Sequence, residues 1–355
     1  MPANTTIVIK EGTTTICSSV FKGCSGLTNV EIPSSLTSIG NDAFGDINAV
    51  FKITAETPAK VGSSAFHADA ILVVPDASVD AYKAAWSSYA NQIVAKELAV
   101  RSVEIEASGV GSALRSAIGD EFTTSVADLT VKGTINSYDV IVLRTKMPLL
   151  RKLDLSEATV VASDMPFYNG NCTKDNDLAN YAFYGLSKLN YVKLPKDLIS
   201  VGNYMFYNCS SLREIELPET VQSIGSNAFN NCKALKEITI PAGVKSINKE
   251  TFKDCAALER VTLPDGLESI EEYAFRYCYN LKEIKLPPTV KTIDYNAFEG
   301  CSSLEEIRIP SSVQSIGEYA FSGCGKLDRV YTYTVEPTAI QESTFSTFQT
   351  ATLYV

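Results

Sequence analysis

The sequence contains a single histidine, His67, among its 355 residues. Acyl transfer by a Ser–His–Asp or Cys–His arrangement needs an imidazole beside the nucleophile, and the regularly spaced cysteines lie far from His67 in sequence. No C-x-x-C pair occurs, so the usual ligand spacing of a zinc site is missing as well. We therefore interpret the protein as a non-enzyme with no catalytic residues, and we expect neither a metal nor a cofactor.

Long apolar runs and a basic charge balance are also missing. No run approaches the ~18 apolar residues of a membrane span, so no membrane insertion is expected. Lys and Arg number 31 against 41 Asp and Glu, and the resulting charge of -10 argues against nucleic acid as a partner. The start, MPANTTIVIKEG, lacks the basic and apolar regions of a signal peptide. Two alternatives remain open, a cytosolic protein or a piece of a longer secreted chain.

The main feature present is a repeat of 23 residues. Prolines keep this step at Pro195, Pro218, Pro241, Pro264, Pro287 and Pro310, and phenylalanines at Phe183, Phe206, Phe229, Phe252, Phe275, Phe298 and Phe321. The consensus is L-x-x-I-x-L-P-x-x-V-x-S-I-x-x-x-A-F-x-x-C-x-x. So many columns in phase indicate a repeat architecture in which each unit stacks on the next.

The repeat predicts its own local structure. LREIEL, from Leu212 to Leu217, alternates apolar and polar residues as a short strand does, and Pro218 ends it because proline has no N–H for the ladder. The A-F-x-x-C segment has apolar residues at i and i+3, which suits one turn of α- or 3₁₀-helix. Stacked units would form a parallel sheet in front of a continuous core. We predict an α/β solenoid with parallel strands on one face.

Two arrays with α/β caps are expected. Degraded repeats such as FKGCSGLTNVEIPSSLTSIGNDAF, followed by a strand at Ile71 to Val74 and a helix from about Asp80 to Tyr89, make residues 1–98 the C-terminal part of a first array with a helical cap. Residues 99–149 are predicted to cap the second array at its N-terminal end. Residues 150–355 form that array, and we expect its final cap to be truncated because the chain stops at Val355.

Within 99–149 the pattern alternates between strand and helix. We expect strands at Val103 to Ala107 and Leu129 to Lys132, and helices at about Val110 to Ile118 and Ser137 to Thr145. SGVGSAL, with Gly109 and Gly111, hints at a dinucleotide loop but has Leu114 at the third glycine position. We interpret it as a glycine-rich helix start.

Cysteines also recur every 23 residues, three positions after a phenylalanine. Degenerate repeats place Leu186 and Ile47 in the same slot, and neither residue can bind metal or form a disulfide. Disulfides between adjacent units are conceivable by distance, but stacked side chains point in parallel. The slot therefore favours buried, free cysteine acting as a small hydrophobic residue.

The motif I/L-P-x-x-V-x-S-I-G-x-x-A-F-x-x-C-x-x-L-x-x-I resembles the BspA-like, or treponemal-type, leucine-rich repeats. The resemblance is strong over roughly 150–330 and weaker over 14–75, and LVVPDASVDAYKAAW resembles the terminal cap of surface proteins from Bacteroides-type bacteria. It implies an extracellular or cell-surface location and, in some members, adhesion to host proteins or other bacteria. The asparagine ladder of other leucine-rich repeats is absent, with Thr220, Gly243, Gly266, Thr289 and Ser312 in its place.

The loop NGNCTKDNDLAN faintly resembles a calcium loop. Asn171, Thr173, Asp175 and Asp177 alternate, but the turn glycine and the bidentate glutamate are missing. We interpret this loop as an exposed insertion in an irregular first repeat.

The remaining candidate site is the outward face of the strands. Its predicted ligand-binding residues flank the buried apolar position of each strand: Tyr191, Lys193, Glu214, Glu216, Glu237, Arg260, Glu283, Lys285, Glu306, Arg308, Arg329 and Tyr331. Thr239 and Thr262 occupy the same columns. Concave solenoid faces commonly bind partners, here a protein or glycan on a host or bacterial surface. The alternatives are a structural spacer within a larger surface protein, or a solvated polar face without a ligand.

Overall fold

The computed structural model describes residues 5–107, 111–333, 342–345 and 352–354. Two compact units divide the chain. The first comprises residues 1–102 with 118–129 and 147–152, and the second comprises 103–117, 130–146 and 153–355. The predicted boundaries at 98/99 and 149/150 stay predictions, and each unit is described by itself.

The first unit is a short stack of rungs. Its front sheet has the order β1-β3-β5-β7-β8, and the neighbouring strands are parallel. These strands are β1 (Thr5–Val8), β3 (Leu27–Ile32), β5 (Val50–Ile53), β7 (Ile71–Val74) and β8 (Ile93–Ala95). A second, narrower sheet contains β2 (Thr15–Ile16), β4 (Ser38–Ile39) and β6 (Lys60–Val61). The strand predicted at Ile71 to Val74 is confirmed, whereas the pattern did not indicate β8.

The helix predicted from Asp80 to Tyr89 is wrong in its extent. In place of one helix, this region contains four short ones: η1 (Asp76–Ser78), α1 (Val79–Ala85), η2 (Ser87–Gln92) and α2 (Lys96–Ala99). Trp86 leaves helical geometry at φ -111° and ψ 51°. Its buried ring lies 5.6 Å from the ring of Phe66, and its indole N–H donates to the carbonyl of Ala59 at 2.8 Å. These tertiary contacts end the helix early.

A mixed segment leads into the second array. Its elements are β9 (Val100–Ile105), α3 (Ala113–Ile118), η3 (Asp120–Ser125), β10 (Asp128–Ile135), α4 (Ser137–Thr145) and β11 (Lys152–Val160). The prediction for α4 is confirmed to the residue, while β9 begins and ends earlier than predicted and β10 is longer. Part of the predicted first helix, with Gly109, falls in 108–110, outside the described residues.

Buried Asp139 explains the position of both helices. Its carboxylate accepts the backbone N–H of Asn136 at 3.1 Å, completing a capping box at the start of α4. The other oxygen accepts the Ser112 hydroxyl at 2.7 Å and the Leu114 N–H at 2.9 Å. One carboxylate therefore holds the first turns of α3 and α4 together.

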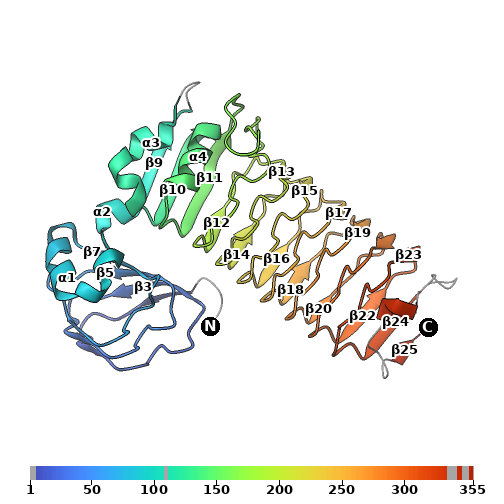
Figure 1. Ribbon diagram of the computed structural model, residues 1–355, viewed down its shortest axis with the longest axis horizontal. Coiled ribbons are helices and arrows are strands. Elements are labelled where there is room, and N and C mark those ends of the chain that lie inside the picture. Colours follow the sequence, from blue (N-terminus) through green and yellow to red (C-terminus); the bar gives the residue numbers. More distant parts are fainter. Residues whose placement is uncertain (1–4, 108–110, 334–341, 346–351, 355) are drawn as a thin grey trace. The chain divides into compact units, whose positions relative to one another are not determined.

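The strands β9, β10 and β11 of the mixed segment share one sheet with the first strands of the second array, in the order β14-β12-β11-β10-β9. The front strands are β12 (Tyr191–Lys193), β14 (Glu214–Glu216), β16 (Glu237–Thr239), β18 (Arg260–Thr262), β20 (Glu283–Ile284), β22 (Glu306–Ile309), β24 (Arg329–Thr332) and β25 (Thr352–Tyr354). The opposite side has β13 (Ser200–Val201), β15 (Ser223–Ile224), β17 (Ser246–Ile247), β19 (Ser269–Ile270), β21 (Thr292–Ile293) and β23 (Ser315–Ile316). Figure 1 shows the front strands side by side along this unit. The solenoid prediction is confirmed.

The register equals the sequence repeat. Ile238 pairs with Val261, and Val261 pairs with Ile284, so each residue meets its counterpart 23 positions on. Behind the strands the phenylalanine rings form one column with centroids 5.2–5.4 Å apart from Phe183 to Phe345. The predicted stacking thus produces a continuous apolar interior.

The A-F-x-x-C segment is a tight turn, and the prediction of a helical turn is wrong. Residues two before and two after the phenylalanine have positive φ, as in Asn227 at 59° and Asn231 at 63°. The alternation points the N–H groups of residues 227, 229 and 231 toward carbonyls of the following rung at 2.8–2.9 Å. Alternate N–H groups of the turn therefore bond to the next rung. The N–H groups between them, of residues 228, 230 and 232, bond within the turn to the carbonyl three residues before, at 3.1–3.2 Å.

The repeated cysteines are buried in the core, as predicted from their slot. Six of them, from Cys209 to Cys324, are fully buried. All nine cysteines are free thiols. Each buried Sγ donates to the carbonyl of the phenylalanine in the preceding rung, for example Cys255 to Phe229 at 3.1 Å. The thiol is thus more than a hydrophobic filler. It donates a second hydrogen bond to a carbonyl that already accepts a backbone N–H, and a leucine in this slot has no donor for it.

Replacing Phe252 with alanine removes one ring from the column. We expect the free energy of unfolding to fall by ~3–5 kcal/mol, because neighbouring rungs cannot close around the cavity. Urea unfolding followed by circular dichroism measures this change, and Lys249→Ala on the exposed surface is the control. A loss no larger than that of the control would show that the column does not stabilise the array.

Thiol reactivity tests the burial of the cysteines. Burial raises the pKa of Cys209 and Cys324 to about 12, so these thiols stay protonated and unreactive. At about pH 8, we expect the exposed or partly exposed Cys17, Cys24 and Cys172 to be the ones that react in the folded protein. In denaturant without reductant, all nine should titrate. Only one or two free thiols in the unfolded protein would contradict the free-thiol assignment.

Candidate binding surface

On the strand face of the second unit, exposed side chains lie on both sides of a row of buried apolar residues, one from each strand. Val192, Ile215 and Ile238 represent that row, with exposures of 0–5%. The residues on either side of each one are partly or fully exposed. Because side chains alternate along a strand, the predicted columns do lie on one face of the sheet.

Two hollows divide the middle of this face. The first, of about 510 Å³, is lined by four of the predicted residues: Glu214, Glu216, Glu237 and Arg260. The second, of about 650 Å³, is lined by Arg260, Glu283, Lys285, Glu306 and Arg308. Tyr191 and Lys193 on β12, like Arg329 and Tyr331 on β24, line neither hollow.

The first hollow is acidic. Glu214, Glu216 and Glu219 contribute carboxylates, and none of the three forms an ion pair with another residue in the described ranges. Glu237 is paired with Arg260 of the next rung at 3.3 Å. The hollow thus presents negative charge that the array itself leaves largely uncompensated.

The second hollow and the strands beyond it are more internally paired. Glu306 binds Arg308 on its own strand and Arg329 on the next, both at 3.2 Å. The Arg308 guanidinium lies 4.2 Å from the ring centre of Tyr331 and donates to the Tyr333 hydroxyl at 3.2 Å. That hydrogen bond, followed by the charge of Glu306, raises the pKa of Arg308 above its ordinary value.

The opposite end of the face contains a tyrosine and lysine pair. Partial burial, the largest effect, raises the pKa of Tyr191. The pKa of Lys193 is also raised, first by Tyr191 and then by Asp154. Lys193 therefore remains a cation at neutral pH and is positioned beside an aromatic hydroxyl.

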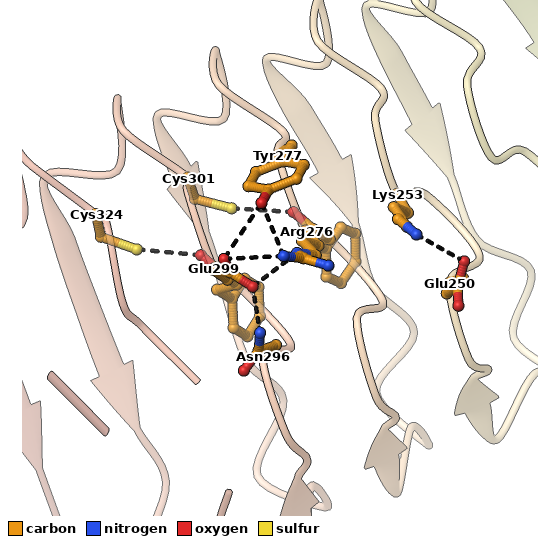
Figure 2. A network of polar contacts seen from close by, with 10 residues as sticks. Glu250, Lys253, Arg276, Tyr277, Asn296, Glu299, Cys301 and Cys324 are labelled. Carbon is orange, nitrogen blue, oxygen red and sulfur yellow. Dashed lines mark hydrogen bonds and ion pairs between the residues drawn. The ribbon is translucent and has the colours of Figure 1, made fainter. Parts of the chain in front are cut away.

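A separate polar network lies in the phenylalanine turns, away from the strand face. Figure 2 shows the side chains of Arg276, Tyr277 and Glu299 in contact with one another. It donates to the Tyr277 hydroxyl at 2.7 Å, and its Nε lies 2.6 Å from a Glu299 carboxylate oxygen. Asn296 donates to the same carboxylate. These contacts join neighbouring rungs, which is typical of structural rather than ligand-binding polar groups.

The sequence analysis missed a tyrosine cluster in the same kind of turn. Its members are Tyr168, Tyr181, Tyr184, Tyr204 and Tyr207. The 181/204 and 184/207 ring pairs stack at 5.0 and 5.3 Å, and Arg144 lies 4.2 Å from the ring centre of Tyr168. The 23-residue spacing within both stacked pairs was a visible signal.

The loop with the calcium-like spacing uses its side chains internally. Asp175 accepts the Ala162 N–H at 2.9 Å, and Asp177 accepts the Ala179 N–H at 2.8 Å. Thr173 is buried and donates to the Val161 carbonyl, while Asn171 accepts from Asn180. Within the described residues, no group of three or more potential metal ligands is present. These contacts are those of an insertion held to its own repeat.

The chain matches the model of the BspA type leucine-rich repeat region in six copies, over residues 3–72, 176–287 and 245–354. This chain belongs to the BspA-type leucine-rich repeat family. The matched ranges include rungs of both units and more than half of the sequence.

Several solved structures are similar to this BspA-type chain. A leucine-rich repeat protein of T. pallidum is 34% identical, with 42% of this chain and 71% of that chain covered and a TM-score of 0.39. A leucine-rich cell surface protein of Faecalibacterium prausnitzii is 20% identical, with 99% and 87% covered and a TM-score of 0.33. A leucine-rich repeat protein of Bacteroides ovatus is 18% identical, with 98% and 91% covered and a TM-score of 0.35. No curated protein matches this chain.

None of the helices in the described part of the chain is both long enough and apolar enough to cross a membrane.

Removing charge from the strand face should leave the fold intact. We expect the combined replacement of Glu214, Glu237, Arg260 and Arg308 by alanine to leave the urea midpoint close to that of the parent, because solvent-exposed ion pairs contribute little. Circular dichroism with urea titration measures this. A large drop in the midpoint would show that the face contributes to stability.

Proposed function

We propose that this protein is a non-enzymatic binding module that acts outside the cell or on a bacterial surface. The strand face of the second unit docks a protein or a glycan of the host or of another bacterium. Membership of the BspA-type family supports the general role, since display on bacterial surfaces and adhesion are what the resemblance implies.

The observation that supports this site most directly is the acidic hollow. The carboxylates of Glu214, Glu216 and Glu219 converge in about 510 Å³ without an ion pair among the described residues. A purely structural array has no need to hold like charges together, because their repulsion opposes stacking. A partner that brings donors or cations to this hollow would relieve that repulsion.

A structural spacer is the second candidate. Ion pairs between successive rungs, such as Arg260 with Glu237 and Arg329 with Glu306, neutralise part of the face. Such pairs are also expected of an array whose role is to hold other domains away from an anchor. Binding that maps only to regions outside this chain would favour the spacer.

The variant with alanine at Glu214, Glu237, Arg260 and Arg308 tests the binding proposal. We expect it to lose adhesion to immobilised collagen, laminin and mucin and to whole bacterial cells, wherever the parent protein binds, because it removes charge from both hollows.

The matched control removes an equally exposed ion pair outside the strand face. Lys249 and Glu272 pair at 2.6 Å between neighbouring turns, and their joint replacement by alanine should leave adhesion unchanged. Equal adhesion of the parent and the strand-face variant would refute the proposed docking site.

A further inference from the structure

A hollow of about 1100 Å³ lies in the first unit, between its phenylalanine turns and the 3₁₀ segment η2. One wall is formed by successive turns that contribute Asp42, Asp46, Ser63 and Ser64. The other wall is formed by the terminal segment and contributes Ser87, Ser88, Asn91 and Gln92. The hollow therefore exists because the capping segment closes over the last rung.

The floor of this hollow is aromatic. Phe66, Trp86 and Tyr89 line it, and their exposures are 3%, 2% and 9%. The rings of Phe66 and Tyr89 meet edge to face at 5.5 Å. They pack mainly against one another, so the floor is firm but offers little open apolar surface to a ligand.

Hydrogen bonds hold the walls in place. The Gln92 amide donates to the carbonyl of His67 at 3.2 Å, which ties η2 to the last turn. The Ser63 N–H donates to the Asn41 side chain at 2.9 Å. A ligand entering this hollow would meet groups that are already positioned, which lowers the entropy cost of binding.

Several polar side chains of the hollow are uncommitted. Asp46, Ser88 and Asn91 are exposed and form no side-chain hydrogen bond or ion pair with another described residue. His67 accepts the Asp69 N–H at its Nδ1, at 3.1 Å. In the neutral ring the proton is then on Nε2, which makes this nitrogen a donor.

The chemistry of the lining selects among ligand classes. Its charged groups are Lys22, Asp42 and Asp46, a balance that does not suit a phosphate or another anion. The buried rings do not suit an apolar ligand. Hydroxyls, amides and carboxylates from both walls provide donors and acceptors in one space. Because each sugar hydroxyl both donates and accepts, a polyhydroxyl ligand matches this set.

We propose that this hollow is a binding site for a neutral saccharide. It is separate from the strand face of the second unit, since every lining residue belongs to the first unit. The two proposals can therefore fail independently.

The experiment uses the only tryptophan, Trp86, which lines the hollow and so reports on this site alone. The full chain is titrated with galactose, mannose, N-acetylglucosamine and short oligomers of glucose and of N-acetylglucosamine. Emission is recorded beside saturation-transfer NMR of the sugars, and glycerol serves as the non-saccharide control. We expect at least one sugar to give a saturable shift with a Kd on the order of 1 mM.

The variant Asp46→Ala/Asn91→Ala removes one uncommitted group from each wall. We expect it to weaken sugar binding about tenfold or more, because each lost hydrogen bond belongs to the ligand rather than to the fold. Glu56→Ala, on the exposed surface of the same unit but outside the hollow, and the strand-face variant should both bind like the parent.

This proposal would be overturned if no sugar gave a response larger than that of glycerol. It would also be overturned if the double variant kept the parent's Kd while its unfolding midpoint matched that of the parent. Loss of sugar binding in the strand-face variant would assign the response to the other unit and would overturn it equally.

Discussion

Each rung of this protein depends on the next for its hydrogen-bond partners. From β12 to β25 the front strands are two to four residues long, so none is stable alone, and alternate N–H groups of the tight turns bond to the following rung. Isolated elements of this size do not overcome their conformational entropy. Stability therefore comes from contacts between successive rungs. Each rung offers its neighbour backbone carbonyls that accept hydrogen bonds, a phenylalanine ring to stack on and a carbonyl that accepts the neighbour's cysteine thiol.

The dependence of each rung on its neighbours limits functional residues to the columns that face outward. Columns that face inward can vary only within narrow limits, because a change there alters two interfaces at once. The outward columns are free to vary from rung to rung, and they differ in kind. The turns carry ion pairs between rungs such as that of Arg276 and Glu299, whereas Glu214 and Glu216 on the strand face form no ion pair with another described residue. The contrast between these two surfaces, rather than charge alone, distinguishes a candidate binding face from a structural one.

Periodicity alone was sufficient to predict the front strands of the regular rungs, their register and the outward columns, because alternation and a constant step are properties of the sequence. It did not indicate the two-residue strands on the opposite side of each rung. It was not sufficient for the turns, since positive φ at residues such as Tyr273 and Glu250 is imposed by bonding between rungs and contradicts their local preference. The end of α1 at Ala85 likewise follows from the burial of Trp86, a tertiary contact. The hollows could not be predicted, because their volumes depend on how side chains from several rungs meet.

The exact repetition of the register has a consequence for how such a chain changes over generations. Since residue i pairs with residue i+23 throughout the regular rungs, excising or duplicating one complete unit at the genetic level joins surfaces that already match. Length can therefore vary by recombination between repeats that share the same register, with little penalty in folding. Lineages can lengthen or shorten this protein in whole steps while its ends, which are not interchangeable, stay the same.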